Sequence, residues 1–102
     1  MIQKLSILIP AYNEGKTIHL ILDRVKNVVL EHNIAKEIVI VNDCSKDDTV
    51  ERVEAYMKAN PEMDIRFFSQ PVNMGKGAAI NRAIKECTGE YLVIQDADLE
   101  YD

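Results

Sequence analysis

Residues 37–41 read Glu37-Ile38-Val39-Ile40-Val41, a β-type run in which apolar and polar side chains hardly alternate. A strand that is apolar on both faces usually lies inside a parallel sheet, where helices cover both sides. The run therefore predicts a central strand of an α/β fold. The segments on either side of it should then supply the covering helices and the neighbouring strands.

The rest of the chain alternates between strand and helix patterns. Further strands are expected at residues 5–9, 65–68 and 91–95, and helices at residues 17–29, 50–60 and 80–87. Pro10 should close the first strand and Gly89 should end the third helix, which buries Ile80, Ala83, Ile84 and Cys87. This β-α-β-α-β-α-β order predicts a Rossmann-like parallel sheet with right-handed crossovers. Ligands of such sheets bind beyond the carboxyl ends of the strands, where the strand order reverses.

Composition narrows the class of protein. A chain of 102 residues with 47% hydrophobic residues makes one small globular domain or part of one. Its net charge of −5 argues against nucleic acid and anionic lipid as partners. The two cysteines form no CxxC pair and indicate reduced thiols, so we expect a cytoplasmic protein. The start already resembles a strand edge, so no signal peptide is expected, and no apolar run approaches the roughly 18 residues of a membrane span.

Acidic side chains follow three of the four predicted strands. Glu14 follows the first, Asp43 the second, and Asp96 and Asp98 the fourth. Because the carboxyl ends of parallel strands share one rim of the sheet, these four carboxylates should crowd together. Like charges at close range are costly unless a metal ion or hydrogen-bond donors lie between them.

Asp96 and Asp98 are two residues apart, so in an extended chain both side chains point the same way, with Cα atoms roughly 6.5–7 Å apart. Both then reach one hard cation, or one holds the cation while the other holds a sugar hydroxyl. Such oxygen ligands suit Mg²⁺ or Mn²⁺ bridging to a diphosphate. The alternative is a solvated acidic loop.

The loops after the first two strands offer groups for a nucleoside. Pro10-Ala11-Tyr12-Asn13-Glu14 lacks the glycines of a dinucleotide fingerprint, which argues against a Rossmann NAD site. The ring of Tyr12 could lie along a base, and Glu14 and Asp43 could accept hydrogen bonds from base or ribose. The alternatives are a strand-to-helix turn for Glu14 and a loop cap for Asp43. Ser45, Asp47, Asp48 and Thr49 are expected to cap the second helix.

Asn73-Met74-Gly75-Lys76-Gly77 superficially resembles a phosphate-binding loop. The pattern fails because the spaced upstream glycine is missing and Gly77 stands where a Ser or Thr would hold Mg²⁺. Gly75 and Gly77 are instead expected to permit close approach at a helix start, where Lys76 could meet an anion.

Four stretches in order resemble the nucleotide-sugar half of family 2 glycosyltransferases, which have the GT-A fold. They are Ile9-Pro10-Ala11-Tyr12-Asn13-Glu14, Val41-Asn42-Asp43-Cys44-Ser45 with Asp48-Thr49, Asn73-Met74-Gly75-Lys76-Gly77-Ala78-Ala79, and Gln95-Asp96-Ala97-Asp98-Leu99-Glu100-Tyr101-Asp102. The last stretch is most similar to the branch with dolichyl-phosphate mannose synthase and bacterial polyprenyl-phosphate glycosyltransferases.

The resemblance implies a metal-dependent, inverting hexosyl transfer from a GDP- or UDP-linked sugar to a lipid phosphate. It implies a nucleotide site made of Pro10, Ala11, Tyr12, Glu14, Val41, Asp43, Lys76, Asp96 and Ala97. It also implies a DXD-type Mg²⁺ or Mn²⁺ site at Asp98, with Asp96 and Glu100. Mannose-synthase relatives often carry Gln at the last of these positions.

Two departures qualify the resemblance. Cys44 stands where the family usually has Gly, which predicts a stiffer loop. The chain also stops at the metal motif, so we expect residues 1–102 to be a donor-binding subdomain without the acceptor half, with no catalytic base identified and little turnover. Exposed strand edges could then drive dimerisation. The alternatives are a non-catalytic nucleotide-binding module, a receiver-type Mg²⁺-binding signalling domain and a nucleotidyltransferase.

Overall fold

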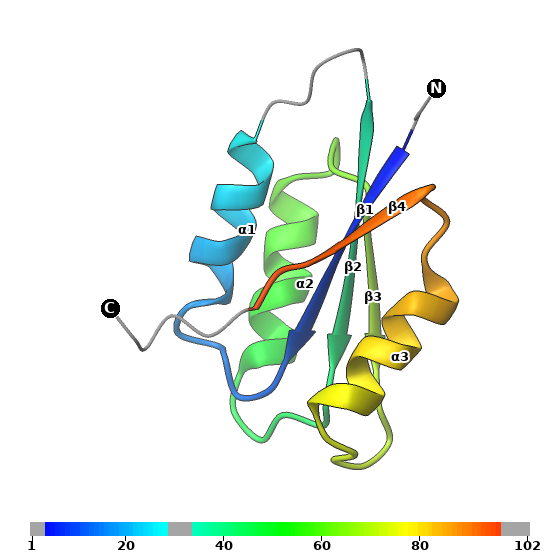
Figure 1. Cartoon of the computed structure of the whole chain (residues 1–102). Coiled ribbons are helices and arrows are strands. Elements are labelled where there is room, and N and C mark those ends of the chain that lie inside the picture. The colour runs from blue at the N-terminus through cyan, green and yellow to red at the C-terminus, as the bar shows by residue number, and fades with distance from the viewer. Residues whose placement is uncertain (1–3, 29–33, 97–102) are drawn as a thin grey trace.

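The structure is a computed structural model that describes residues 4–28 and 34–96. Seven elements alternate along the chain (Figure 1). The strands are β1 (Lys4–Ala11), β2 (Ala35–Asn42), β3 (Ile65–Ser69) and β4 (Tyr91–Ile94), and the helices are α1 (Ile18–Asn27), α2 (Thr49–Ala59) and α3 (Lys76–Glu86). The predicted α/β alternation is confirmed.

All strand pairs are parallel, and the sheet order is β3-β2-β1-β4. This is the first part of the doubly wound order 3-2-1-4-5-6, whereas receiver-type domains place β1 between β2 and β3. The topology therefore excludes the receiver-type alternative. The chain builds the sheet to one side of β1 and then crosses to the other side for β4. The order thus reverses between β1 and β4.

Helices cover the two faces of the sheet unequally. In Figure 1, α1 and α2 lie on one side of the sheet and α3 lies on the other. The face towards α1 and α2 has a core of ten buried residues, among them Ile9, Leu22 and Ile40. The face towards α3 has five, among them Val39 and Ala83. Burial on both faces of β1 and β2 is the physical reason why residues 37–41 do not alternate.

The first strand runs two residues further than predicted and includes Pro10. The carbonyl of Ala11 accepts the N–H of Asp43 on the β2 side, and the carbonyl of Leu8 accepts the N–H of Gln95 on the β4 side. Successive residues of a strand direct their polar groups to opposite neighbours, so Pro10 lacks its N–H on the β4 side. Since β4 ends at Ile94, opposite Leu8, that missing donor breaks no ladder.

The predicted end of the third helix is wrong in two details. Helix α3 ends at Glu86, with Cys87 already extended, so Gly89 is not its cap. A Cβ on Gly89 would lie 2.3 Å from Ser6 Oγ and 2.7 Å from Ser6 N, so this glycine permits close packing against β1. Ile84 is exposed rather than buried, because α3 is the one described helix on this face and the core there is small.

The fourth strand is the least covered element. Its four residues, Tyr91, Leu92, Val93 and Ile94, are all between 43% and 58% exposed. They belong to an edge strand, paired with β1 alone among the described strands. Strand β4 therefore presents both an apolar surface and an open hydrogen-bonding edge.

Candidate functional site

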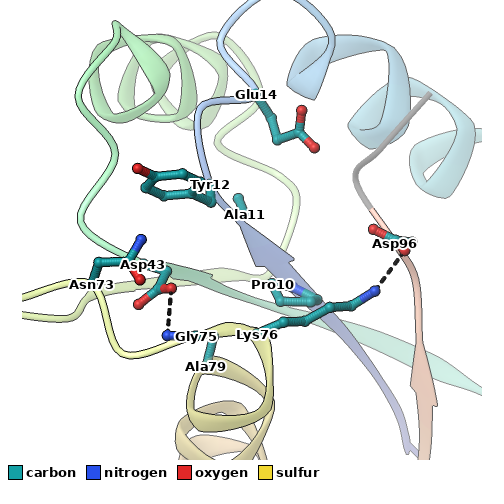
Figure 2. Close-up of a pocket in the computed structure, with 10 residues that line it drawn as sticks. All are labelled: Pro10, Ala11, Tyr12, Glu14, Asp43, Asn73, Gly75, Lys76, Ala79 and Asp96. Atoms are coloured by element: carbon teal, nitrogen blue, oxygen red, sulfur yellow. Dashed lines mark hydrogen bonds and ion pairs between the residues drawn. The ribbon is translucent and has the colours of Figure 1, made fainter. Parts of the chain in front are cut away.

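A cavity of about 430 Å³ opens at the carboxyl ends of β1, β2 and β4. Its lining comes from strand ends far apart in sequence and from the start of α3 (Figure 2). The lining residues are Pro10, Ala11, Tyr12, Glu14, Asp43, Asn73, Gly75, Lys76, Ala79 and Asp96. The cavity thus lies at the switch point between β1 and β4, where parallel α/β sheets bind ligands.

Hydrogen bonds between side chains and backbone fix the β1–α1 loop against the β2–α2 loop. Asn13 has a left-handed backbone, with φ of 54°. Its N–H donates to Ser45 Oγ (2.9 Å), and its side-chain oxygen accepts the N–H of Lys46 (2.8 Å). Ser45 is anchored in turn by the buried Asn42, which accepts its N–H at 3.1 Å. These contacts hold the loop that carries Tyr12 and Glu14.

Asp47 and Thr49 make a second link to the same loop. Asp47 accepts the N–H of Thr49 (2.9 Å) and that of Gly15 (3.1 Å), while Thr49 Oγ1 accepts the N–H of Glu14 (2.9 Å). Burial raises the pKa of Asp47, but the hydrogen bonds from Thr49 and Gly15 outweigh burial and lower this pKa below its ordinary value. Asp47 thus accepts the first N–H of α2, whereas Asp48, which stands at the N-cap position, makes no side-chain cap hydrogen bond and pairs with Arg52 at 2.8 Å. The hydroxyls of Ser45 and Thr49 accept N–H groups of the β1–α1 loop, so the prediction that these two residues cap α2 is wrong.

Asp43 connects the end of β2 to the start of α3. Its side chain is almost fully buried, and its two oxygens accept the N–H groups of Met74 (2.8 Å) and Gly75 (2.9 Å). Gly75 has φ of 94°, a conformation that side chains disfavour, and this explains the glycine at that position. Asp43 therefore sets the position of the loop that leads to Lys76, and it does not cap its own backbone.

Lys76 and Asp96 meet across the cavity. Lys76 is the first residue of α3, and Asp96 follows β4 by two residues. The Nζ of Lys76 lies 2.7 Å from Oδ2 of Asp96, as Figure 2 shows, and both side chains are about half exposed. The ammonium group of Lys76 therefore pairs with Asp96, the carboxylate that the sequence analysis expected to contact nucleotide and metal.

The structure brings seven of the predicted site residues into one cavity: Pro10, Ala11, Tyr12, Glu14, Asp43, Lys76 and Asp96. Val41 is fully buried beside Leu8 and Ala79 and is not among the lining residues. Ala97, Asp98 and Glu100 lie outside the described residues. Within residues 4–28 and 34–96, no group of three or more His, Cys, Asp or Glu side chains is placed to hold a metal ion.

Three lining residues were not predicted as site residues. Asn73 and Gly75 belong to the stretch at residues 73–77, in which the sequence predicted a ligand contact for Lys76 alone. Ala79 follows one turn after Lys76 on α3 and is fully buried. Its small side chain gives no local signal, because only the packing of α3 against the sheet brings it to the cavity.

Known proteins share both the sequence and the fold of this chain. The model of the family described as "Glycosyl transferase family 2" matches residues 6–102. A dolichyl-phosphate beta-glucosyltransferase, ALG5A of Trichomonas vaginalis, is 44% identical over 99 residues, which cover 92% of this chain and 30% of the relative. The chain belongs to glycosyl transferase family 2, as the resemblance predicted.

Two solved structures extend the comparison. The mannosyltransferase PcManGT from Pyrobaculum calidifontis, in complex with GDP-Man and Mn²⁺, superposes with a TM-score of 0.86 at 30% identity and covers 92% of this chain and 27% of that one. TarS 1-349 of S. aureus, in complex with UDP, gives 0.82 at 30% identity, with 94% and 28% covered. The chain thus spans less than a third of each of these three proteins. Among the described helices, none is long and apolar enough to span a membrane.

Proposed function

We propose that this chain is the nucleotide-sugar-binding subdomain of a glycosyltransferase that transfers a hexose from a GDP- or UDP-linked donor to a polyprenyl phosphate. The observation that carries the proposal is the cavity at the β1–β4 switch point, lined by acidic and aromatic side chains from separate strand ends and by Lys76 at the start of α3. The relative named for dolichyl phosphate supports the acceptor class, and the neighbours with GDP-Man and UDP support the donor class.

The nucleoside would lie at the β1 and β2 ends of the cavity. Tyr12 is 41% exposed and its ring borders the cavity, where it can stack on a base (Figure 2). Glu14 and Asp43 can accept hydrogen bonds from base or ribose. Asp43 already accepts two backbone N–H groups, but a carboxylate has about four acceptor positions. Val41 would support the floor of the site from below rather than touch the base.

The diphosphate would lie between the start of α3 and the end of β4. Lys76 supplies a cation there, and the first N–H groups of a helix favour an anion. Asp96 borders the cavity, and its carboxylate oxygens are ligands of the kind that Mg²⁺ and Mn²⁺ bind. Asp98 and Glu100, with Asp96, would hold Mg²⁺ or Mn²⁺ in a DXD-type site. When bound, such a cation would neutralise the negative charge that develops on the departing diphosphate.

The reaction would invert the configuration at the anomeric carbon. A phosphate oxygen of the acceptor forms a bond to that carbon from the side opposite the nucleotide, and the bond from the carbon to the diphosphate oxygen breaks. The nucleoside diphosphate leaves with the electron pair of that bond. Because a lipid phosphate is already an anion, it needs little help from a base. We assign no catalytic base to this chain, and we expect the 102-residue chain alone to bind donor weakly and turn over little.

We infer that donor binding takes place in the cytoplasm, at the face of the membrane that holds the lipid phosphate. Both cysteines in the described part of the chain are free thiols, which accords with a reducing compartment. The exposed β4 edge suits homodimerisation of the 102-residue chain. A nucleotide-binding module without catalysis is the second candidate, because the cavity offers groups for a nucleotide and we assign no catalytic base among the residues that line it.

Calorimetric titration of the chain with UDP and with GDP, each with and without Mn²⁺, tests the proposal. We expect one nucleotide to bind, to bind more tightly with Mn²⁺, and to lose that gain in Asp98→Ala. Asp64→Ala is the matched control, since Asp64 is exposed and lines no part of this cavity. If neither nucleotide binds to the chain or to a version extended at its C-terminus, the donor-site proposal is wrong. Turnover by the extended chain would separate the transferase from the non-catalytic module.

A further inference from the structure

The ion pair between Lys76 and Asp96 joins two elements across the cavity. Lys76 begins α3, which follows β3, whereas Asp96 follows β4 on the far side of β1. Both residues line the cavity, and their charged atoms are 2.7 Å apart (Figure 2). The pair therefore lies where α3 faces the end of β4, within the space proposed for the diphosphate.

Each partner has the charge that a different part of the proposed ligand needs. An ammonium group complements a phosphate anion, and a carboxylate complements a divalent cation. While the two side chains pair with each other, each offers its charge to the ligand only after the pair opens. The nucleotide phosphates therefore compete with Asp96 for Lys76, and the metal ion competes with Lys76 for Asp96.

We infer that Lys76 occupies the cation position at Asp96 in the empty cavity and moves to the diphosphate when donor binds, so that Asp96 is released to the divalent cation. This inference rests on the proposed donor site and adds an exchange of partners within it. Lys76 is then a coupling residue, since the arrival of nucleotide makes the metal position available.

The exposure of the pair fits such an exchange. The side chains of Lys76 and Asp96 are 57% and 47% exposed. Ion pairs in contact with solvent are weak, typically changing an equilibrium by about fivefold or less, so this pair opens at little cost. A fully buried pair would hold Lys76 in place, because breaking it leaves a buried charge without a partner.

The exchange predicts effects of opposite sign on the two ligands. Removal of the Lys76 charge should raise the affinity for Mn²⁺ alone by about two- to fivefold, because the carboxylate no longer pairs with the ammonium. The same change should lower the affinity for nucleotide. Since coupling between two ligands is reciprocal, the factor by which Mn²⁺ strengthens nucleotide binding should also fall. A merely structural role of Lys76 would weaken both ligands together.

The experiment compares Lys76→Met with Lys85→Met, which removes the same charge from the last turn of the same helix. The 102-residue chain is titrated with MnCl₂ alone, with UDP and GDP alone, and with nucleotide at saturating Mn²⁺. Circular dichroism and urea midpoints check that each variant folds. We expect Lys76→Met to bind Mn²⁺ alone more tightly than Lys85→Met and the parent chain do. If the parent chain binds no Mn²⁺, we expect Lys76→Met to bind it detectably.

Unchanged or weaker Mn²⁺ binding in Lys76→Met, or no binding in any chain, would overturn the inference. Asp96→Asn gives the reverse test: it removes the ion pair between Asp96 and Lys76, so nucleotide without metal should bind about two- to fivefold more tightly. Failure of the donor site is distinguishable, because the titration with Mn²⁺ alone needs no nucleotide. If nucleotide binds to the parent chain but Lys76→Met leaves the Mn²⁺ affinity unchanged, the donor-site proposal stands and the proposed exchange is wrong.

Discussion

Cys44 has a left-handed backbone, with φ of 60°, in the loop that follows β2. A side chain in this conformation costs roughly 1–2 kcal/mol, and glycine avoids that cost. The structure therefore gives a physical reason why glycine would suit this position. The loop around residue 44 is held by Asn42, which accepts the N–H of Ser45, and by Asn13 of the β1–α1 loop, which accepts the N–H of Lys46.

The left-handed backbone of residue 44 should lower the stability of any variant that keeps a side chain there. Cys44→Gly should be more stable than Cys44→Ala by about 1 kcal/mol, because both remove the thiol but only glycine relieves the left-handed backbone. Urea unfolding of the two variants measures the difference. Equal stabilities would show that residue 44 does not adopt this conformation in solution.

Asp47 gives a prediction about pH. Its pKa is lowered in the folded state, so its contribution to the free energy of unfolding is complete above the ordinary value of 3.8 and is lost as the pH falls through the folded pKa. At pH 7, Asp47→Ala should lose about 1 kcal/mol of stability. The difference between the parent chain and Asp47→Ala should shrink as the pH falls below about 4.

Urea unfolding at pH 7, 5 and 3 measures this change. Asp48→Ala is the control, because Asp48 pairs with Arg52 on the surface and caps nothing with its side chain. A stability difference for Asp47→Ala that is constant across this pH range would contradict the role of its charge.

At the scale of elements, the connection from α3 to β4 is pinned to the amino end of the sheet. The fully buried Glu37 accepts the N–H of Thr88 at 3.1 Å, and Ser6 Oγ accepts the N–H of Gly89 at 2.8 Å. Lys4 lies 3.7 Å from the Glu37 carboxylate and partly compensates its charge. This anchor lies at the end of the sheet away from the cavity, so it determines where β4 begins.

Two glycines near α3 should respond to alanine in opposite ways. Gly89→Ala should cost about 1–3 kcal/mol, because its Cβ would meet Ser6, including the Ser6 backbone. Gly77→Ala should add up to about 0.5–1 kcal/mol, because no described atom beyond its chain neighbours and its own helix backbone lies within 4 Å of its Cβ position, and alanine favours the helix. Thermal or urea unfolding distinguishes them, and equal losses would contradict the close packing at Gly89.

At the scale of the whole molecule, the exposed β4 strand predicts self-association. Light scattering of the 102-residue chain should show a mass that rises with concentration. Val93→Lys should keep the chain monomeric, because a charge on an edge strand opposes pairing between edges. Ile84→Lys, which changes an exposed isoleucine on α3, is the matched control and should still associate. A monomeric parent chain at high concentration would rule out this assembly.

The order of elements was predictable because local periodicity reports burial. Residues 38–41 are apolar without alternation, and the structure buries both faces of β2. Boundaries were less predictable. Pro10 indicated a strand end, yet the strand continues because no β4 partner remains opposite it. Ile84 fits the helical period but is exposed, since no second helix or further strand among the described elements covers that side of α3.

The sequence by itself determined the alternation of strands and helices, the family, and the loops that carry the polar side chains. These features depend on local patterns and on motifs that a linear chain displays. The tertiary structure decided what those loops do together. Asp43 binds the N–H groups of Met74 and Gly75, and Lys76 pairs with Asp96, 20 positions along the chain. Such contacts depend on the order β3-β2-β1-β4, which places the start of α3 opposite the end of β4 and leaves a cavity between them.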